Sequence, residues 1–236
     1  MHNRLTLQVR TPPESRWTGV ELRVLVDGRD VVADVFEAGP NGDPDELLGP
    51  LAPERLSREV QLAEADCTEG CCGAIYVSVK RDGDDVVWDG WRNPDAVGVE
   101  IGPFRFDAEQ YGAELARANG ERGWEWPGRT IARLVRQALG DDPDVLGEWN
   151  SSVDFLQSRP SSRAEIELVF TSPPAETVTE FYRIFERAME HRQFRLRLPV
   201  SDEPVMDQAQ GIVDALSGSD PRERAEICGG YGNSIM

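Results

Sequence analysis

The chain has 236 residues, of which 39% are hydrophobic and 29% charged, a composition typical of a folded, soluble protein. With 25 basic and 43 acidic residues its formal net charge is -18, which opposes binding to the phosphate backbone of a nucleic acid. No stretch approaches the roughly 20 apolar residues that cross a bilayer, and the first residues alternate instead of forming a signal-peptide core. We therefore expect a cytoplasmic protein with reduced cysteines that binds neither nucleic acid nor membranes.

The first part of the chain predicts β-strands joined by turns. Apolar and polar residues alternate at positions 5–9 and 20–26, with the period of two that is typical of a half-buried strand. Asp27 and Gly28 follow, and this pair supplies the positive φ angles of a tight hairpin turn. We expect the second strand of the hairpin at residues 31–36.

A second group of strands follows a connection rich in proline and glycine, residues 39–57. Residues 60–64, 74–79 and 86–88 are predicted as strands of an antiparallel meander, and a further short strand is expected near residues 97–101. The first hundred or so residues are therefore predicted to be mainly antiparallel β-structure.

The hydrophobic period changes at Asp107 from that of a strand to that of a helix. Asp107 with Gln110 three residues later resembles a capping box, and Gly120 is a suitable end, so a helix is predicted between them. The next predicted elements are a helix that begins at a proline and a pair of strands, at residues 127–140, 149–156 and 164–171.

Residues 175–190 form the strongest predicted helix of the chain, because apolar residues recur at helical spacing and Pro173 and Pro174 precede the first turn. We expect this helix to dock on a sheet. The last predicted elements are a strand and two helices, at residues 194–198, 203–217 and 220–228.

Together these elements predict an α+β protein. An antiparallel β meander forms the N-terminal half, residues 1–106, and a mixed helix and strand region forms the C-terminal half, residues 107–236. No linker rich in proline, serine and glycine separates the halves, so we expect them to pack against each other.

Three of the four cysteines lie within six residues, in the run CTEGCC between two predicted strands. A tight connection brings Cys67, Cys71 and Cys72 together, so that they can bind a soft metal, cycle through a disulfide, or pack as small apolar side chains. Zinc usually takes four ligands and commonly a C-x2-C spacing, which this run lacks. A zinc site would therefore need a distant ligand such as Cys228, and zinc is the one cofactor that the sequence leaves open.

The sequence contains none of the catalytic signatures that depend on fixed residues at fixed spacing. It has no Gly-x-Ser-x-Gly elbow, no His-Glu-x-x-His and no phosphate-binding Gly-x-x-x-x-Gly-Lys. Its two histidines are His2 and His191, and the second falls at the end of a predicted helix, where a cation suits the helix dipole. Catalysis by histidine is therefore a weaker interpretation than a structural role.

An acidic turn and a pair of tryptophans are candidate contacts for a partner, namely Asp82, Asp84, Asp85, Trp88 and Trp91. The carboxylates lie close together, but the turn lacks the twelfth-position glutamate of a helix-loop-helix calcium site. Neighbouring tryptophans form binding platforms, and they also anchor the layers of a sheet.

Three hypotheses of function follow. The leading one is a non-catalytic acidic protein that acts by protein–protein association, in the manner of an inhibitor or an immunity protein, with the acidic N-terminal half facing a basic partner. The alternative is a small metal-binding or thiol-redox protein centred on the CTEGCC run. The third is an enzyme whose site leaves no recognisable motif.

Overall fold

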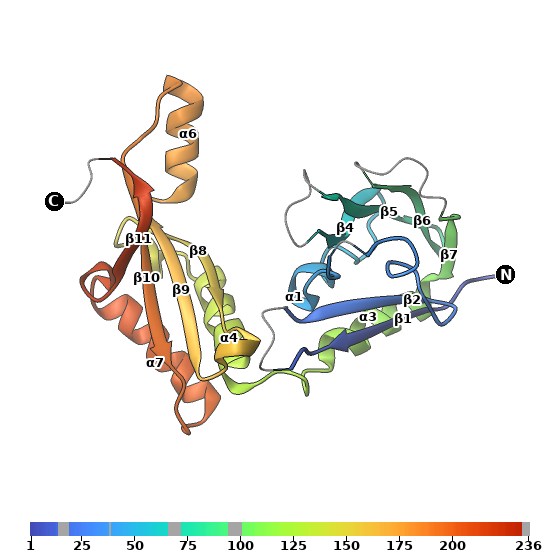
Figure 1. Cartoon of the computed structure of the whole chain (residues 1–236), viewed down its shortest axis with the longest axis horizontal. Coiled ribbons are helices and arrows are strands. Elements are labelled where there is room, and N and C mark those ends of the chain that lie inside the picture. The colour runs from blue at the N-terminus through green and yellow to red at the C-terminus, as the bar shows by residue number, and fades with distance from the viewer. Residues whose placement is uncertain (14–18, 38, 66–71, 94–100, 233–236) are drawn as a thin grey trace. The chain divides into compact units, whose positions relative to one another are not determined.

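The structure is a computed structural model (Figure 1), and it describes residues 1–13, 19–37, 39–65, 72–93 and 101–232. Within these ranges the protein is α+β, and its strands form three antiparallel sheets. The chain divides into two compact units, Met1–Trp124 and Glu125–Met236, which are called the N-unit and the C-unit below. Over the described residues, no helix has both the length and the apolar character needed to cross a membrane.

The N-unit contains a three-stranded sheet of order β1-β2-β3 and a four-stranded sheet of order β4-β5-β6-β7. The strands are β1 Leu5–Arg10, β2 Glu21–Val26, β3 Arg29–Asp30, β4 Arg58–Glu64, β5 Ala74–Asp82, β6 Asp85–Arg92 and β7 Phe104–Asp107. The helices described in this unit are α1 Pro44–Leu47 and α3 Ala108–Gly120. The predicted meander is thus confirmed for β4, β5 and β6, whereas the strand expected near 97–101 lies mostly outside the described residues.

The predicted hairpin turn between β2 and β3 is confirmed. Asp27 and Gly28 have φ angles of 52° and 81°, as a two-residue turn of this kind requires. The strand predicted at residues 31–36 is wrong, because β3 ends at Asp30. The Asp30 carboxylate accepts a hydrogen bond from the amide of Ala33 at 3.0 Å and so turns the chain. Val31, Val32 and Phe36 are buried although they do not belong to a strand, whereas Val35 is exposed.

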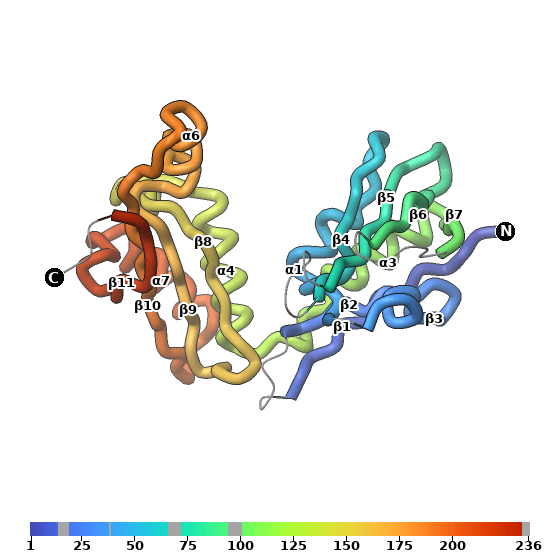
Figure 2. Tube along the Cα trace, turned by 45° about the horizontal axis from the view of Figure 1, so that its top comes forward, coloured from blue at the N-terminus to red at the C-terminus, as the bar shows by residue number. Residues whose placement is uncertain are grey.

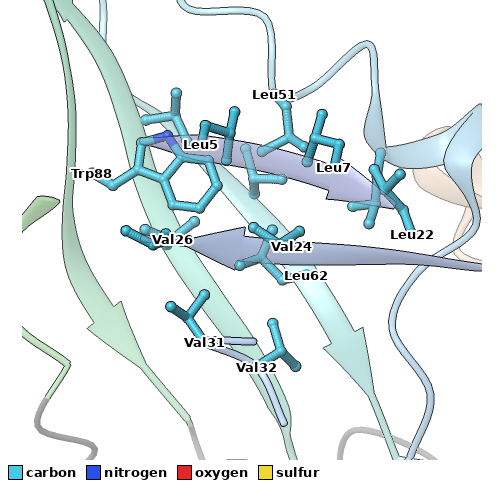
Figure 3. Close-up of a cluster of buried hydrophobic side chains, with 14 of the residues drawn as sticks. Leu5, Leu7, Leu22, Val24, Val26, Val31, Val32, Leu51, Leu62 and Trp88 are labelled. Carbon is cyan, nitrogen blue, oxygen red and sulfur yellow. The ribbon is translucent and has the colours of Figure 1, made fainter. Parts of the chain in front are cut away.

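The core of the N-unit is formed by side chains from both sheets (Figure 3). Alternate residues of β1 and β2 are buried, as the period of two predicted, and Trp88 of β6 and Leu62 of β4 belong to the same cluster. Each fully buried side chain of this size contributes about 1.5–3 kcal/mol relative to an exposed one. This core is therefore sufficient to hold the two sheets together.

Side chains of α3 close the outer edge of β1, on the side away from β2. Gln110 Nε2 donates a hydrogen bond to the Leu5 carbonyl at 3.1 Å, and the Leu7 amide donates to Glu114 Oε1 at 2.6 Å. Arg117 donates to the Leu7 carbonyl at 2.6 Å. These three residues follow one another at about one helical turn, so they reach successive outward backbone groups of the strand. The helix thereby prevents β1 from pairing with another chain.

The C-unit is a four-stranded antiparallel sheet of order β11-β10-β9-β8 with two long helices, α4 and α7, packed together (Figure 1). Its elements are α4 Pro127–Asp141, α5 Asp144–Gly147, β8 Ser152–Gln157, β9 Glu165–Ser172, α6 Ala175–Phe185, β10 His191–Pro199, α7 Val205–Gly218 and β11 Glu226–Tyr231, with short 3-10 helices at Pro160–Ser162 and Pro221–Glu223. The core of this unit combines α4 and α7 with alternate residues of the strands, such as Leu168 and Phe170. It shares no residue with the core of the N-unit.

Most of the elements predicted for the C-unit are confirmed, but the prediction of a helix at residues 220–228 is wrong. Residues 220–228 form a short 3-10 helix followed by β11, which begins at Glu226 opposite Arg195 of β10. Asp220 caps the 3-10 turn by accepting a hydrogen bond from the amide of Arg222 at 3.0 Å. The local sequence favours a helix, whereas the exposed backbone edge of β10 provides the partners that make it a strand.

The helix predicted at residues 175–190 is shorter than expected and does not dock on the sheet. α6 ends at Phe185, because Glu186 adopts a left-handed conformation with φ of 51°. None of its eleven residues is buried. Figure 1 and Figure 2 both show α6 beyond the end of the β9 and β10 strands that it connects. The prediction that this helix packs on a sheet is therefore wrong.

Candidate functional site

The cysteine run lies in the connection between β4 and β5. The Ala65 amide donates a hydrogen bond to the Gly73 carbonyl at 3.0 Å, so the two ends of the connection are held together. Cys72 is exposed, whereas Cys67 and Cys71 lie outside the described residues. The structure therefore describes the two ends of this connection and does not test how its sulfur atoms are arranged.

Gly73 allows the close approach of a neighbouring side chain at the base of this connection. Its φ is 90°, and a Cβ atom there would lie 2.4 Å from Asn93 Oδ1, which is closer than atoms can pack. Asn93 follows the end of β6, so Gly73 is packed against the first residue after the neighbouring strand.

The fourth cysteine belongs to a different unit from the CTEGCC run. Cys228 lies on β11 of the C-unit, where it is partly buried. Among the residues that the structure describes, no group of three or more histidine, cysteine, aspartate or glutamate side chains is placed to hold a metal ion. Zinc binding therefore stays a prediction that depends on the undescribed cysteines.

Two carboxylates of the acidic turn are paired with cations of the N-unit. Asp85 contacts the Arg105 guanidinium and accepts a hydrogen bond from His2 Nε2 at 2.8 Å, and Asp82 lies 3.4 Å from Arg105. The hydrogen bond from Arg105 lowers the pKa of Asp85 below its usual value, and His2 adds to the effect. The Asp84 carbonyl accepts the amide at the start of α3. The acidic turn therefore binds His2 near the N-terminus and Arg105 of β7. These pairs partly neutralise its carboxylates, so less negative charge remains for a partner.

The predicted tryptophan contacts belong to an aromatic cluster. Trp88 is 0% exposed, so its side chain is core and is not available to a partner. Its indole N–H donates to the Tyr111 hydroxyl at 3.2 Å, and that hydroxyl donates to the Leu51 carbonyl at 2.8 Å. Burial raises the pKa of Tyr111. Trp91 is partly buried, with its ring centroid 6.0 Å from those of Trp88 and Phe104. Trp88 is therefore a core residue, and Trp91 packs against the same aromatic cluster.

α6 carries an exposed apolar surface that its sequence pattern did not predict. Tyr182, Ile184 and Phe185 are 62%, 57% and 55% exposed. The Phe181 and Phe185 rings lie 4.6 Å apart, and the Arg187 guanidinium lies within 6 Å of both ring centroids. These five residues are called the α6 surface below. Helical periodicity alone predicts an apolar face and does not reveal whether that face is covered.

The α6 surface is held in place at its base and not along its length. The amide of Ala175, the first residue of the helix, donates to Ser152 Oγ at 3.0 Å, and Ser172 Oγ donates to the Asn150 carbonyl at 2.9 Å. Arg222 also donates to Ser172 Oγ at 3.2 Å. The sheet therefore fixes where the helix begins, while its aromatic side chains remain in contact with solvent.

A groove lies beside β10, next to the first residue of β11. β11 pairs with β10 only from His191 to Arg195, so Leu196–Pro199 has no partner on that side within the described residues. A cavity of about 270 Å³ occupies this position, between the uncovered strand segment and α7. Its lining includes Leu196 and Leu198 of β10 and Ile212 and Leu216 of α7. We call it the β10–α7 groove.

Comparison with known proteins adds no relative: no protein family, no curated protein and no solved structure matches this chain.

Proposed function

We propose that the protein is non-catalytic and acts by associating with another protein, and that the α6 surface is the contact. One observation carries the proposal: a helix of eleven residues has none of them buried, although its apolar side chains recur at helical spacing. Soluble proteins seldom leave a contiguous group of large apolar side chains in water unless the group binds something.

The energetics of α6 support this interpretation. An isolated helix shorter than about 12–15 residues is marginal in water, because propagation does not offset the cost of nucleation. Helices of this length are normally stabilised by packing of the apolar face, and within the described residues α6 lacks that packing. A partner that covers Tyr182, Ile184 and Phe185 would supply it.

The residue types also suit a protein contact. Tyrosine, phenylalanine and arginine are enriched among the residues that dominate binding energy at interfaces. The helix carries Glu176 and Glu180 as well as Arg183, so it lacks the basic polar face of helices that lie on anionic membranes. A protein partner therefore fits this surface better than a lipid surface.

Charge supports a basic partner. Residues 1–124 contain 24 acidic and 13 basic side chains, and the whole chain carries a net charge of -18. Such a field accelerates encounter with a basic protein and repels nucleic acid. We infer that the N-unit steers the partner by its field and that the α6 surface supplies the short-range contact, in a cytoplasmic setting.

A photocrosslinking residue in place of Phe185 tests the proposal in cells, and the same residue in place of Glu180 provides a control on the charged face of the helix. We expect one partner to be crosslinked from position 185 and not from 180. The identified partner, once purified, should bind the wild-type protein, bind the Phe185→Asp variant at least tenfold more weakly, and bind the Glu180→Gln variant as tightly as wild type. Equal binding by Phe185→Asp would refute the role of α6.

A second candidate function rests on the closed connection between β4 and β5. The Ala65–Gly73 hydrogen bond joins the two residues that flank segment 66–72, and that segment contains three of the four cysteines. Thiols that lie close together would bind a soft metal or undergo thiol–disulfide exchange. Elemental analysis of protein purified without added metal, with thiol labelling before and after chelation, tests it: less than a tenth of an equivalent of metal with labelling unchanged by chelator rules out the metal site.

A further inference from the structure

The β10–α7 groove combines an uncovered strand edge with an apolar floor. In the antiparallel ladder between β9 and β10, the Val200 amide bonds to the Ala164 carbonyl, so Leu196 and Leu198 direct their backbone groups to β9 as well. The backbone N–H and C=O of Arg197 then point to the opposite side, where β11 is absent. An edge of this kind accepts an additional strand.

The space beside the edge is widened by a glycine in the middle of α7. Gly211 lines the groove, and a Cβ atom added to it would meet no other atom within 4 Å. Glycine in a helix interior is unfavourable relative to alanine. Packing within the described residues does not require it, and its effect is to leave room above Ile212.

The two ends of the groove carry opposite charges. Glu203 and Asp207 lie at the end where β10 passes into α7. Arg224 lies at the other end, where its guanidinium donates to the Ala215 carbonyl at 3.3 Å. Asp207 and Ala215 are eight residues apart on one helix, so the ends are separated by about 12 Å. The carboxylate of Glu226 beyond that end already faces Arg195 and Arg197.

We propose that the β10–α7 groove binds an extended peptide that pairs antiparallel to residues 196–199 of β10, with a basic group at its amino end and a carboxylate at its carboxyl end. An antiparallel strand runs from the Pro199 end of the segment to the Leu196 end. Its amino end then lies beside Glu203 and Asp207, and its carboxyl end lies beside Arg224. Side chains at alternate positions enter the apolar floor. The peptide continues the line of β11.

This site is independent of the α6 surface, so its test does not depend on the proposed function. The probe is a fluorescein-labelled hexapeptide with lysine first, aspartate last and alternating valine and threonine between them. A second probe exchanges the lysine and the aspartate. Fluorescence anisotropy with the full chain measures the dissociation constant of each.

We expect saturable binding of the first probe and at least fivefold weaker binding of the second. Gly211→Leu fills the groove and should weaken binding of the first probe at least tenfold while leaving the fold intact, since leucine favours the helix. Gly112→Leu, at a helical glycine of α3 whose Cβ would also meet nothing, is the matched control and should bind like wild type.

Charge reversal provides the second pair of variants. Arg224→Glu should reverse the preference between the two probes, whereas Arg183→Glu on α6 should leave it unchanged. Absence of saturable binding up to millimolar protein would overturn the proposal. Equal affinity of wild type and Gly211→Leu for the first probe, or an unchanged preference in Arg224→Glu, would overturn it as well.

Discussion

The two units of this protein differ in how far other parts of the chain cover the edges of their sheets. In the N-unit, α3 covers β1, the Asn3 amide bonds to the Arg105 carbonyl at the outer side of β7, and the Gly42 amide bonds to the Leu62 carbonyl of β4. In the C-unit, β11 stops after covering half of β10, and α6 stands apart from the core. Closed edges prevent association, whereas open edges and exposed apolar side chains permit it. This contrast supports our proposal that the C-unit carries the binding surfaces.

The largest expected effect is a loss of stability in the N-unit, whose sheet edges are covered. Trp88→Ala removes a fully buried side chain from the aromatic cluster and should lower the free energy of unfolding of the N-unit by about 3–5 kcal/mol. Hydrogen exchange followed by mass spectrometry should show faster exchange in peptides from β1, β2 and β6. Because the two cores share no residue, peptides from β9 and β10 should exchange as in wild type. Faster exchange throughout the chain would contradict the division into separately stabilised units.

The next test concerns the hydrogen bonds between α3 and β1, which are called the α3–β1 seam. Arg117→Met removes the donor to the Leu7 carbonyl and the partner of Glu114, and should cost about 1–3 kcal/mol, because a backbone acceptor and a carboxylate lose their hydrogen bond. Denaturant unfolding followed by circular dichroism measures this loss. The control is Arg29→Met, whose side chain is largely exposed and pairs only with Asp34, and which should change stability by less than about 0.5 kcal/mol. Equal losses in the two variants would show that α3 does not seal the edge.

The same seam should make stability depend on pH. The hydrogen bond from Arg117, with a further one from the Leu7 amide, lowers the pKa of Glu114 below its ordinary value of 4.5. A carboxylate whose pKa is lowered by folding stabilises the protein fully above the unfolded-state pKa, and this contribution is lost as the pH falls through the folded-state pKa. Glu114→Gln should therefore be less stable than wild type at pH 7, and the difference should shrink below pH 4.5.

Unfolding measured at a series of pH values checks this expectation. Glu109→Gln, at an exposed position of the same helix, is the control and should follow the wild-type curve. A Glu114→Gln curve that stays parallel to wild type from pH 7 to pH 3 would show that the carboxylate contributes nothing to the seam. The expected effect is smaller than that of Arg117→Met, because the backbone contact of Arg117 is retained.

Local signals predicted the closed parts of the molecule well. The Asp27-Gly28 turn fixes two φ angles, and Asp107 accepts the Gln110 amide at 2.9 Å as the capping pattern indicated. These features depend on neighbours in sequence, so the sequence is enough to find them. The change in hydrophobic period at residue 107 is also real, although α3, which begins there, packs with the strands that precede it.

Features that depend on distant partners were not predictable in this way. β11 is a strand because β10 presents an edge to it, although its local sequence favours a helix. The pattern of α6 is that of any amphipathic helix, and only the three-dimensional structure shows that none of its residues is buried by the described part of the chain. Trp88 and Trp91 carried no sequence signal that separates a core cluster from a binding platform. The candidate surfaces were therefore the least predictable part of this protein.

The smallest expected change in stability is for a substitution on α6, and it tests most directly whether the α6 surface is free to bind a partner. Phe185→Ser on α6 should change the free energy of unfolding by less than about 0.5 kcal/mol, because the side chain is 55% exposed and no layer covers it. Phe170→Ala on β9, in the core of the same unit, should cost about 3–5 kcal/mol. Denaturant unfolding of both variants gives the comparison. A loss above 1 kcal/mol in Phe185→Ser would mean that the α6 surface is covered in solution by the protein itself, and its apolar side chains would then belong to the fold and not to a partner.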